Sequence, residues 1–278
     1  MINLVLTALF LFPGGDGEPV TDEPVTRTFR STNLINTRSV DQLFAGTWEF
    51  RVGHRFGDAY TGLYDMFGLD LGASVSFGID AALSDDWMVG VSRSNTLKTW
   101  DFHTQYRLMS QTTSGSKPVS VSLYGQWDQS LLKSAETTHL MASVLIARKW
   151  TRDFSTQIAP VIIQRLRTAK SETDAQPMWG VTATAHYLLT KTVGVMVEWT
   201  PMFNRDAYNT NSAQRLAWDA VSVGVNFEVA GHSFQILASN SNQISTIRSV
   251  LGSDRDWTDK HFFLGFNLTR LYTWESPL

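Results

Sequence analysis

Apolar and polar side chains alternate along residues 43–56, whose sequence is LFAGTWEFRVGHRF. One face of this segment carries four aromatic rings and a valine: Phe44, Trp48, Phe50, Val52 and Phe56. The opposite face carries the charged residues Glu49, Arg51 and Arg55. Successive side chains of a β-strand point to opposite sides of the sheet. The segment is therefore predicted to be a strand with one apolar face and one polar face.

The same alternation returns along the rest of the chain and predicts about twelve strands. The segments are residues 43–56, 74–81, 87–92, 100–108, 119–128, 140–146, 155–165, 179–187, 193–199, 221–229, 234–239 and 262–269. Segment 155–165 is ambiguous, because Ile158, Val161, Ile162 and Ile163 break the strict alternation. It also contains Pro160, which lacks the backbone N–H that a paired strand needs.

The connections between these segments are by turns short and long. Short connections lie at 83–86, 151–153, 188–191 and 230–232, and long ones at 57–72, 128–137, 166–177, 200–216 and 240–260. This order is typical of outer-membrane barrels, whose tight turns face the periplasm. The predicted fold is an all-β, closed, antiparallel, transmembrane up-and-down β-barrel of about twelve strands, with both termini periplasmic.

Large aromatic side chains mark both ends of the apolar faces. They form two expected belts at the lipid interface: Trp87, Trp100, Tyr106, Trp127, Trp150, Trp179, Tyr187 and Trp199. Aromatic rings favour the headgroup region of a bilayer, because it offers both apolar and polar surroundings. A soluble core would give no reason for tryptophans to collect at the ends of strands. The apolar faces are therefore predicted to contact lipid.

Ionisable side chains collect on the polar faces. The residues expected to line the lumen are Glu49, Arg51, Arg55, Asp80, Asp101, His103, Arg107, Asp128, His186, Glu198 and Glu228. They could form a charged lining that selects solutes, or internal salt bridges that fill a narrow barrel. Eight-stranded barrels are filled by side chains and barrels of 16 or more strands hold channels. Twelve strands lie between these cases, so the strand number is compatible with both a conducting pore and a plugged barrel.

The composition agrees with export to a membrane. The chain of 278 residues has no cysteine, a formal net charge of −3 and no apolar run long enough for a transmembrane helix, and nothing in it indicates nucleic-acid binding. Residues 1–17 resemble a weak signal peptide without its basic start. Residues 18–42 form an N-terminal extension, of which 28–42 act as a plug inside the barrel or as a periplasmic collar, and residues 43–274 form the barrel.

No catalytic motif is found, and the chain is not expected to be an enzyme. His232-Ser233 and Ser239-Asn240 resemble an outer-membrane phospholipase motif only superficially, because His232 and Asn240 fall at opposite ends of one segment. His103 and His186 are expected to be hydrogen-bonded fillers rather than metal ligands, and no cofactor is expected. The aromatic loop 57–72 either folds inward as a constriction or packs over the rim.

Several stretches resemble a family of bacterial membrane-bound β-barrel domains of unknown function (domain of unknown function 5777), common in Bacteroidota-type genomes. They are TFRSTNLINTRSV (28–40), FRVGHRFG (50–57), YDMFGLD (64–70), VGVSRSNTLKTWD (89–101), GHSFQILASNS (231–241) and FLGFNLTR (263–270). The resemblance spans residues 26–272 and implies a barrel in the outer membrane. It implies no activity, substrate or catalytic residue.

The predicted function is porin-like passage of small solutes, or a membrane scaffold for a periplasmic or surface partner, in the outer membrane of a Gram-negative bacterium. The alternative is a closed structural barrel without conduction, and a remote alternative is a lipolytic enzyme. The expected partners are the lipid bilayer and a periplasmic protein or lipoprotein. The oligomeric state stays open.

Overall fold

The alternating segments form a single closed antiparallel barrel in a computed structural model of the chain. The structure describes residues 22–133, 137–168, 176–206, 216–229 and 231–274. Within them the strands are β1 (Thr47–Asp58), β2 (Ser74–Ala82), β3 (Trp87–Ser94), β4 (Thr99–Met109), β5 (Ser120–Ser130), β6 (Thr137–Lys149), β7 (Phe154–Thr168), β8 (Met178–Leu188), β9 (Val193–Thr200), β10 (Ala220–Val229), β11 (His232–Ser239) and β12 (Phe263–Thr273). Each of the twelve predicted strands is present, which confirms the predicted closed antiparallel barrel.

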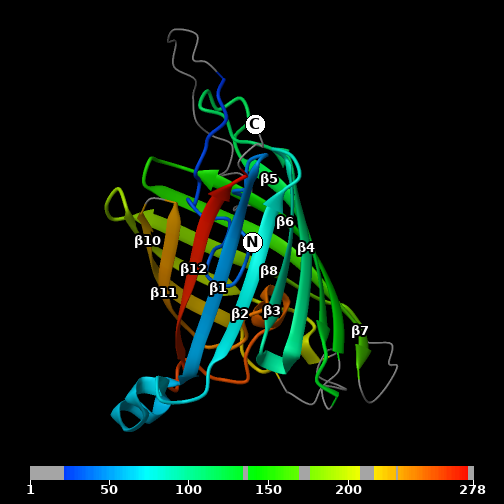
Figure 1. Ribbon diagram of the computed structural model, residues 1–278, viewed down its shortest axis with the longest axis vertical. Coiled ribbons are helices and arrows are strands. Elements are labelled where there is room, and N and C mark those ends of the chain that lie inside the picture. The colour runs from blue at the N-terminus through cyan, green and yellow to red at the C-terminus, as the bar shows by residue number, and fades with distance from the viewer. Residues whose placement is uncertain (1–21, 134–136, 169–175, 207–215, 230, 275–278) are drawn as a thin grey trace, which may run out of the picture.

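The barrel closes between its first and last strands (Figure 1). β1 pairs antiparallel with β12, with Trp48 opposite Tyr272 and Val52 opposite Leu268. The rings of Trp48 and Tyr272 stack with their centroids 4.3 Å apart on the outer surface. Closure satisfies the hydrogen bonds of both edge strands, which a strand in contact with lipid requires.

Alternation along each strand divides the wall into an outer and an inner face. In β4 every second residue from Thr99 to Gln105 is buried, while Trp100 and Phe102 are exposed. β8 and β9 repeat this pattern. The exposed side chains are mainly large and apolar, and the buried ones are mainly polar or charged. This inside-out distribution is the one expected of a barrel in lipid.

Strand β7 is longer than the sequence predicted. Pro160 is paired with Val181 of β8, and Pro160 itself is exposed on the outer face. On the β6 side the pairing is interrupted between Ser143 and Ile146, and the Ser143 hydroxyl donates to the Pro160 carbonyl at 2.8 Å. The missing N–H of proline is thus accommodated by a local gap in one ladder.

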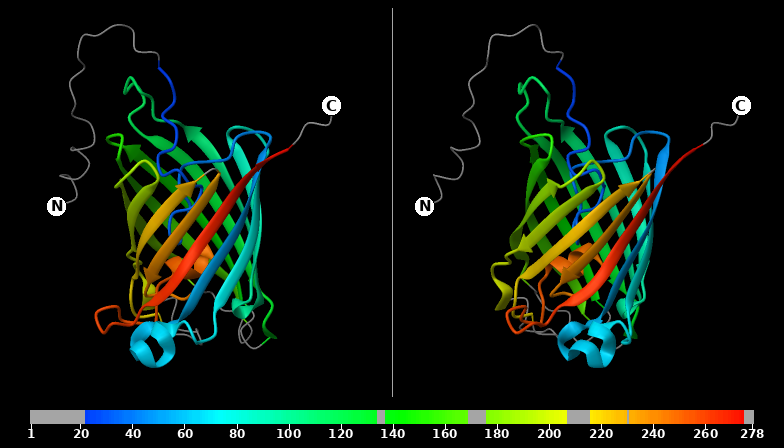
Figure 2. Two further views of the ribbon diagram at one scale, coloured as in Figure 1. Left: turned by 60° about the vertical axis from the view of Figure 1, so that its left-hand side comes forward. Right: turned by 90° about the vertical axis from the view of Figure 1, so that its left-hand side faces the viewer.

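The start of β1 and the end of β12 lie at the same rim as the short turns. Residues 22–46 enter the barrel from this rim (Figure 2). The opposite rim carries the long connections, which include the kinked 3₁₀ segment η1 (Ala59–Gly68) and the helix α3 (Thr246–Val250), and also the short β3–β4 connection with η2 (Thr96–Lys98). No helix in the described part of the chain is long and apolar enough to cross a membrane.

Candidate functional site

The N-terminal segment, defined here as residues 28–42, lies inside the barrel. Its chain folds back on itself, with an antiparallel bridge between Asn33 and Arg38 and backbone hydrogen bonds from Leu34 to Thr37 and from Ser39 to Thr32. Phe29, Leu34, Ile35 and Val40 of the segment are buried and form an apolar cluster with Ala147, Met196 and Leu237 of the wall. The segment therefore fills part of the lumen.

The tip of this segment, Ile35 to Thr37, is bound by four strands. Glu198 of β9 accepts from the Asn36 backbone N–H at 3.0 Å and from the Thr37 hydroxyl at 2.8 Å. Further donors and acceptors come from three other strands: Arg55 to the Asn36 side chain at 3.1 Å, Asn36 to Ser222 at 2.7 Å, and Asn267 to the Ile35 carbonyl at 2.9 Å. Lumen side chains thus replace the water that this backbone would otherwise bind.

Arg38 anchors the segment to β2. Its guanidinium donates to the Asp80 carboxylate at 2.7 and 3.1 Å, and both side chains are almost completely buried. Asp80 also accepts a hydrogen bond from Arg51 Nη2 at 3.1 Å and lies 2.9 Å from His103 Nε2. Buried charges of this kind are stable only when each has its partners. The network depends on Gly90, since a Cβ there would lie 2.0 Å from Asp80 and 2.3 Å from His103.

The base of the segment, residues 28–30 and 38–41, is held through hydrogen bonds to its backbone. Gln157 of β7 donates to the Arg38 carbonyl at 2.8 Å and accepts from the Val40 N–H at 2.9 Å. The Asp41 carboxylate accepts from the N–H groups of Thr28, Phe29 and Arg30 at 2.8–3.1 Å. Burial raises the pKa of Asp41, and the three N–H donors oppose that rise. The segment is thus a folded unit with its own internal closure.

A second inner segment, the connection between β11 and β12 (residues 240–262), enters from the opposite rim. Its residues Ser245 and Arg248 reach two lumen carboxylates. Ser245 donates to Asp101 at 2.7 Å, and Arg248 binds Asp128 at 3.0 Å. Asp128 also lies 2.8 Å from His139 Nδ1. The lumen acids thus divide between the two inner segments.

Helix α3 of this connection packs on an apolar patch of the inner wall. Ile247, Val250 and Leu251 are buried there against inward-facing residues of β5–β8, namely Tyr124, Met141, Leu145, Ala159, Val161, Ile163 and Met178. This packing was not predicted from the sequence. The signal was present as the break in alternation at Val161 and Ile163, because inward apolar residues need an apolar partner inside the barrel.

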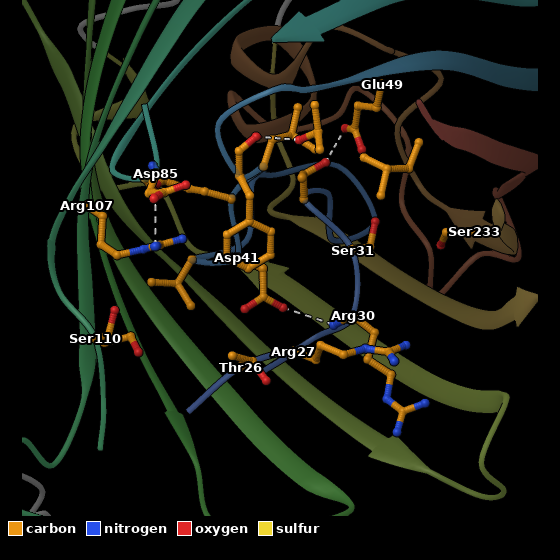
Figure 3. A pocket seen from close by; sticks show the side chains of 18 of the residues that line it. Thr26, Arg27, Arg30, Ser31, Asp41, Glu49, Asp85, Arg107, Ser110 and Ser233 are labelled. Atoms are coloured by element: carbon orange, nitrogen blue, oxygen red, sulfur yellow. Dashed lines mark hydrogen bonds between the residues drawn. The ribbon is translucent and has the colours of Figure 1, made fainter. Parts of the chain in front are cut away.

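A cavity of about 860 Å³ lies beside the N-terminal segment at the short-turn rim (Figure 3). Arg107 of β4 and Asp85 of the β2–β3 turn lie on one side of it. Arg27, Arg30 and Asp41 belong to the N-terminal part of the chain that crosses it. Arg30 binds Glu228 at 3.4 Å, and Arg107 donates to the Asp85 carbonyl at 3.0 Å. Pro24, Val25, Leu43, Phe44 and Leu271 add apolar surface to the lining. Its size is that of a small-ligand or peptide site.

The residues expected in the lumen lie on the inner side of the wall. Glu49, Arg55, Asp80, Asp101, His103, Asp128, His186 and Glu198 are buried, whereas Arg51, Arg107 and Glu228 are partly buried. Of the aromatic residues expected in the belts, Trp87, Trp100, Tyr106, Trp179, Tyr187 and Trp199 are exposed, and Trp127 and Trp150 are half-buried. Their contacts with solute and lipid stay predictions.

The three histidines singled out by the sequence, His103, His186 and His232, lie in separate surroundings. His186 packs near the Phe29 ring, and His103 contacts the Arg38–Asp80 pair. His232 begins β11 and Asn240 follows its end, so the two residues of the phospholipase-like motif lie at opposite rims. Within the described residues, no group of three or more histidine or acidic side chains is arranged for a metal ion.

The chain is similar to several solved structures of porins and channels. The NanC porin is 10% identical over 81% of this chain and 99% of its own, with a TM-score of 0.49. The KdgM porin is 8% identical over 81% and 98%, with a TM-score of 0.46. The COG4313 outer membrane channel from Pseudomonas putida F1 is 10% identical over 83% and 97%, with a TM-score of 0.44.

No curated protein sequence matches the chain. The family model described as "Membrane bound beta barrel domain (DUF5777)" matches residues 29–272, which include all but the first residue of the N-terminal segment and all but the last residue of the twelve-stranded barrel. A closed antiparallel barrel with an apolar outer face is the form that outer-membrane proteins take. The chain belongs to this family of membrane-bound β-barrel domains, and it is an outer-membrane barrel of a Gram-negative bacterium, as the sequence predicted.

Proposed function

We propose that the protein is a closed barrel that serves as a membrane scaffold rather than as a standing pore. The observation that carries this proposal is the close approach of the two inner segments, which leave only small spaces between them. A cavity of about 40 Å³ is lined by Asn36 and Thr37 from one segment and by Ile244 and Thr246 from the other. Another of about 10 Å³ is lined by Arg38 and by Thr246 and Val250. Spaces of this size hold roughly one water molecule.

The second inner segment supports a permanent closure. It is joined to strands at both of its ends, and α3 is packed on the apolar patch of β5–β8. To leave the lumen it would have to expose Ile247, Val250 and the patch itself. Exposing such side chains to water costs about 1.5–3 kcal/mol each. This segment is therefore the less movable of the two.

The cavity at the short-turn rim supports a scaffold role. We infer that this rim faces the periplasm, because tight turns do so in outer-membrane barrels. The cavity would then be open to a periplasmic partner, and its mixed lining of Arg27, Arg107, Asp85 and apolar side chains suits a peptide segment of that partner.

The second candidate is a gated conduit for small solutes, and the polar docking of the N-terminal segment favours it. Arg38, Asn36 and Thr37 are held by hydrogen bonds and ion pairs that water could replace. Withdrawal of this segment toward the short-turn rim would leave α3 as the remaining obstruction. The lipolytic alternative has no such support, since His232 and Asn240 lie at opposite rims.

Single-channel conductance in a planar bilayer tests the proposal. We expect the full chain to stay silent under conditions in which a known porin conducts, and a variant without residues 22–42 to stay nearly silent because α3 remains in place. Porin-sized steps in the deletion variant alone would favour the gated conduit. Sustained steps in the full chain would overturn the closed barrel.

A further inference from the structure

The connection between β1 and β2 exposes an apolar surface at the long-loop rim. In and beside η1 the exposed side chains are Tyr60, Leu63, Tyr64, Met66, Phe67 and Leu69. Leu63 is 76% and Tyr64 89% exposed. Their exposure is large for apolar residues in one short segment, and contiguous exposed apolar surface marks an interaction site.

This segment is firmly attached to the barrel. The Ala59 N–H donates to the Phe262 carbonyl at 2.8 Å, and the Tyr60 ring stacks on His261 with centroids 4.3 Å apart. Gly68 has a φ of +85° and approaches β1 so closely that a Cβ would lie 2.3 Å from the Gly57 carbonyl oxygen. The exposed apolar residues therefore belong to a fixed element of the fold.

The backbone of η1 takes an unfavourable conformation at two large residues. Met66 and Phe67 have φ angles of +48° and +56°, in the left-handed region that bulky side chains rarely adopt. Strained backbone of this kind persists where the surrounding structure holds it and is concentrated at functional sites. Here it accompanies two apolar side chains that remain exposed.

The position of η1 indicates what covers it. It lies at the rim where β1 ends and β12 begins, and Figure 1 shows it projecting sideways from the wall, away from the lumen, while in both views of Figure 2 it lies at the front of the same rim. Neither reading of the loop from sequence anticipated this, because it was expected to fold inward or over the rim. Directly above it on the same wall, the outward-facing rings of His54, Phe56 and Phe266 are in contact. The apolar surface of η1 is thus continuous with the lipid-facing wall.

We propose that η1 is an interfacial membrane anchor of the barrel, with its apolar side chains in the headgroup and upper acyl region of the outer leaflet. Tyrosine and other aromatic rings are favoured at that depth, and η1 contains no Lys or Arg and a single Asp65. Its continuity with the lipid-facing rings favours lipid over a protein partner. The proposal does not depend on whether the lumen conducts.

Depth-dependent fluorescence quenching tests whether η1 is an interfacial anchor. The absence of cysteine from the chain makes labelling at a single position simple. The variant Tyr64→Cys would carry a bimane fluorophore in phosphatidylcholine vesicles with acyl chains brominated near the headgroup. Interfacial segments bury about 5–10 Å deep. We therefore expect roughly the quenching of a label at the exposed belt position Trp199→Cys, and far more than at Lys117→Cys in the β4–β5 turn.

Two outcomes would overturn the proposal. Quenching by aqueous iodide but not by the brominated lipid, as expected at Lys117→Cys, would place η1 in water. Protection from both quenchers would mean that protein covers η1. Because Tyr64 points away from the barrel with 89% exposure, its replacement leaves the anchoring contacts of Tyr60 and Gly68 intact. The variants at 199 and 117 report whether the barrel itself is correctly inserted.

Discussion

At the scale of single residues, Asp80 is the side chain whose charge the lumen depends on most. It is completely buried and binds Arg38 and Arg51, with His103 beside it. A buried ion that loses its partner is costly, because it is left without both water and a counter-charge. Asp80 joins the wall to the N-terminal segment, so its loss would be felt in both.

The variant Asp80→Asn is expected to lower the free energy of unfolding by about 3–5 kcal/mol, since it leaves the buried Arg38 without its carboxylate. Urea unfolding of the barrel in lipid vesicles measures this change. The matched control is Asp86→Asn in the β2–β3 turn, where the carboxylate is 58% exposed and 3.7 Å from Arg107. The control should change stability by less than about 1 kcal/mol. Equal effects of the two variants would contradict the role given to Asp80.

A lipid-facing residue gives the second prediction. Ile79 is exposed in the middle of β2, between Phe50 of β1 and Val91 of β3. Ile79→Arg should destabilise the inserted barrel by about 2–4 kcal/mol, because a charge at mid-bilayer is poorly solvated. The same unfolding measurement in vesicles detects this, with Ile79→Met as the control. If the two substitutions were equally tolerated, the facing of the whole wall would be in doubt.

The sequence could predict which face each of these residues takes, because alternation has a period of two and Asp80 and Ile79 are neighbours in it. It could not predict the partners of Asp80. Arg38, Arg51 and His103 come from three separate parts of the chain, and only the closed barrel with its inner segment brings them together.

At the scale of elements, the connection between β11 and β12 is the largest departure from expectation. The length and position of residues 240–260 predict an outer loop, whereas the structure places α3 inside the barrel. Val161 and Ile163 are the reason, because they give β7 an inward apolar face that α3 covers. Both residues are among those that made β7 ambiguous in the sequence. The strand is apolar on both faces, because one face contacts lipid and the other contacts α3.

The packing of α3 gives a prediction at this scale. Ile247 is fully buried in the apolar patch, and Ile247→Ala is expected to cost about 2–5 kcal/mol through lost burial and a residual cavity. Trp257→Ala in the same connection removes a larger side chain that is mostly exposed, so it should cost much less. Thermal unfolding of the purified barrel in detergent compares the two. A greater loss for Trp257→Ala would contradict the inward packing of α3.

At the scale of the whole molecule, the barrel has an apolar outer surface, and its lumen is largely filled by its own two inner segments. Alternation, connection lengths and the position of the tryptophans could predict the number of strands and the closure. They could not predict how full the lumen is. Residues 28–42 and 240–262 bind lumen side chains through contacts between distant parts of the chain, such as Asn36 with Ser222 and Ser245 with Asp101.

The occupancy of the lumen can be measured directly by cross-linking in outer membranes. The Asn36 amide donates to the Ser222 hydroxyl at 2.7 Å on the inner face of β10, while the next residue, Val223, is exposed on the outer face. In a chain without cysteine, the pair Asn36→Cys with Ser222→Cys should be bridged by dibromobimane, which fluoresces when it joins two thiols. The pair Asn36→Cys with Val223→Cys should not be bridged. Bridging of neither pair, together with free labelling of position 36 by a bulky maleimide, would contradict an N-terminal segment inside the barrel.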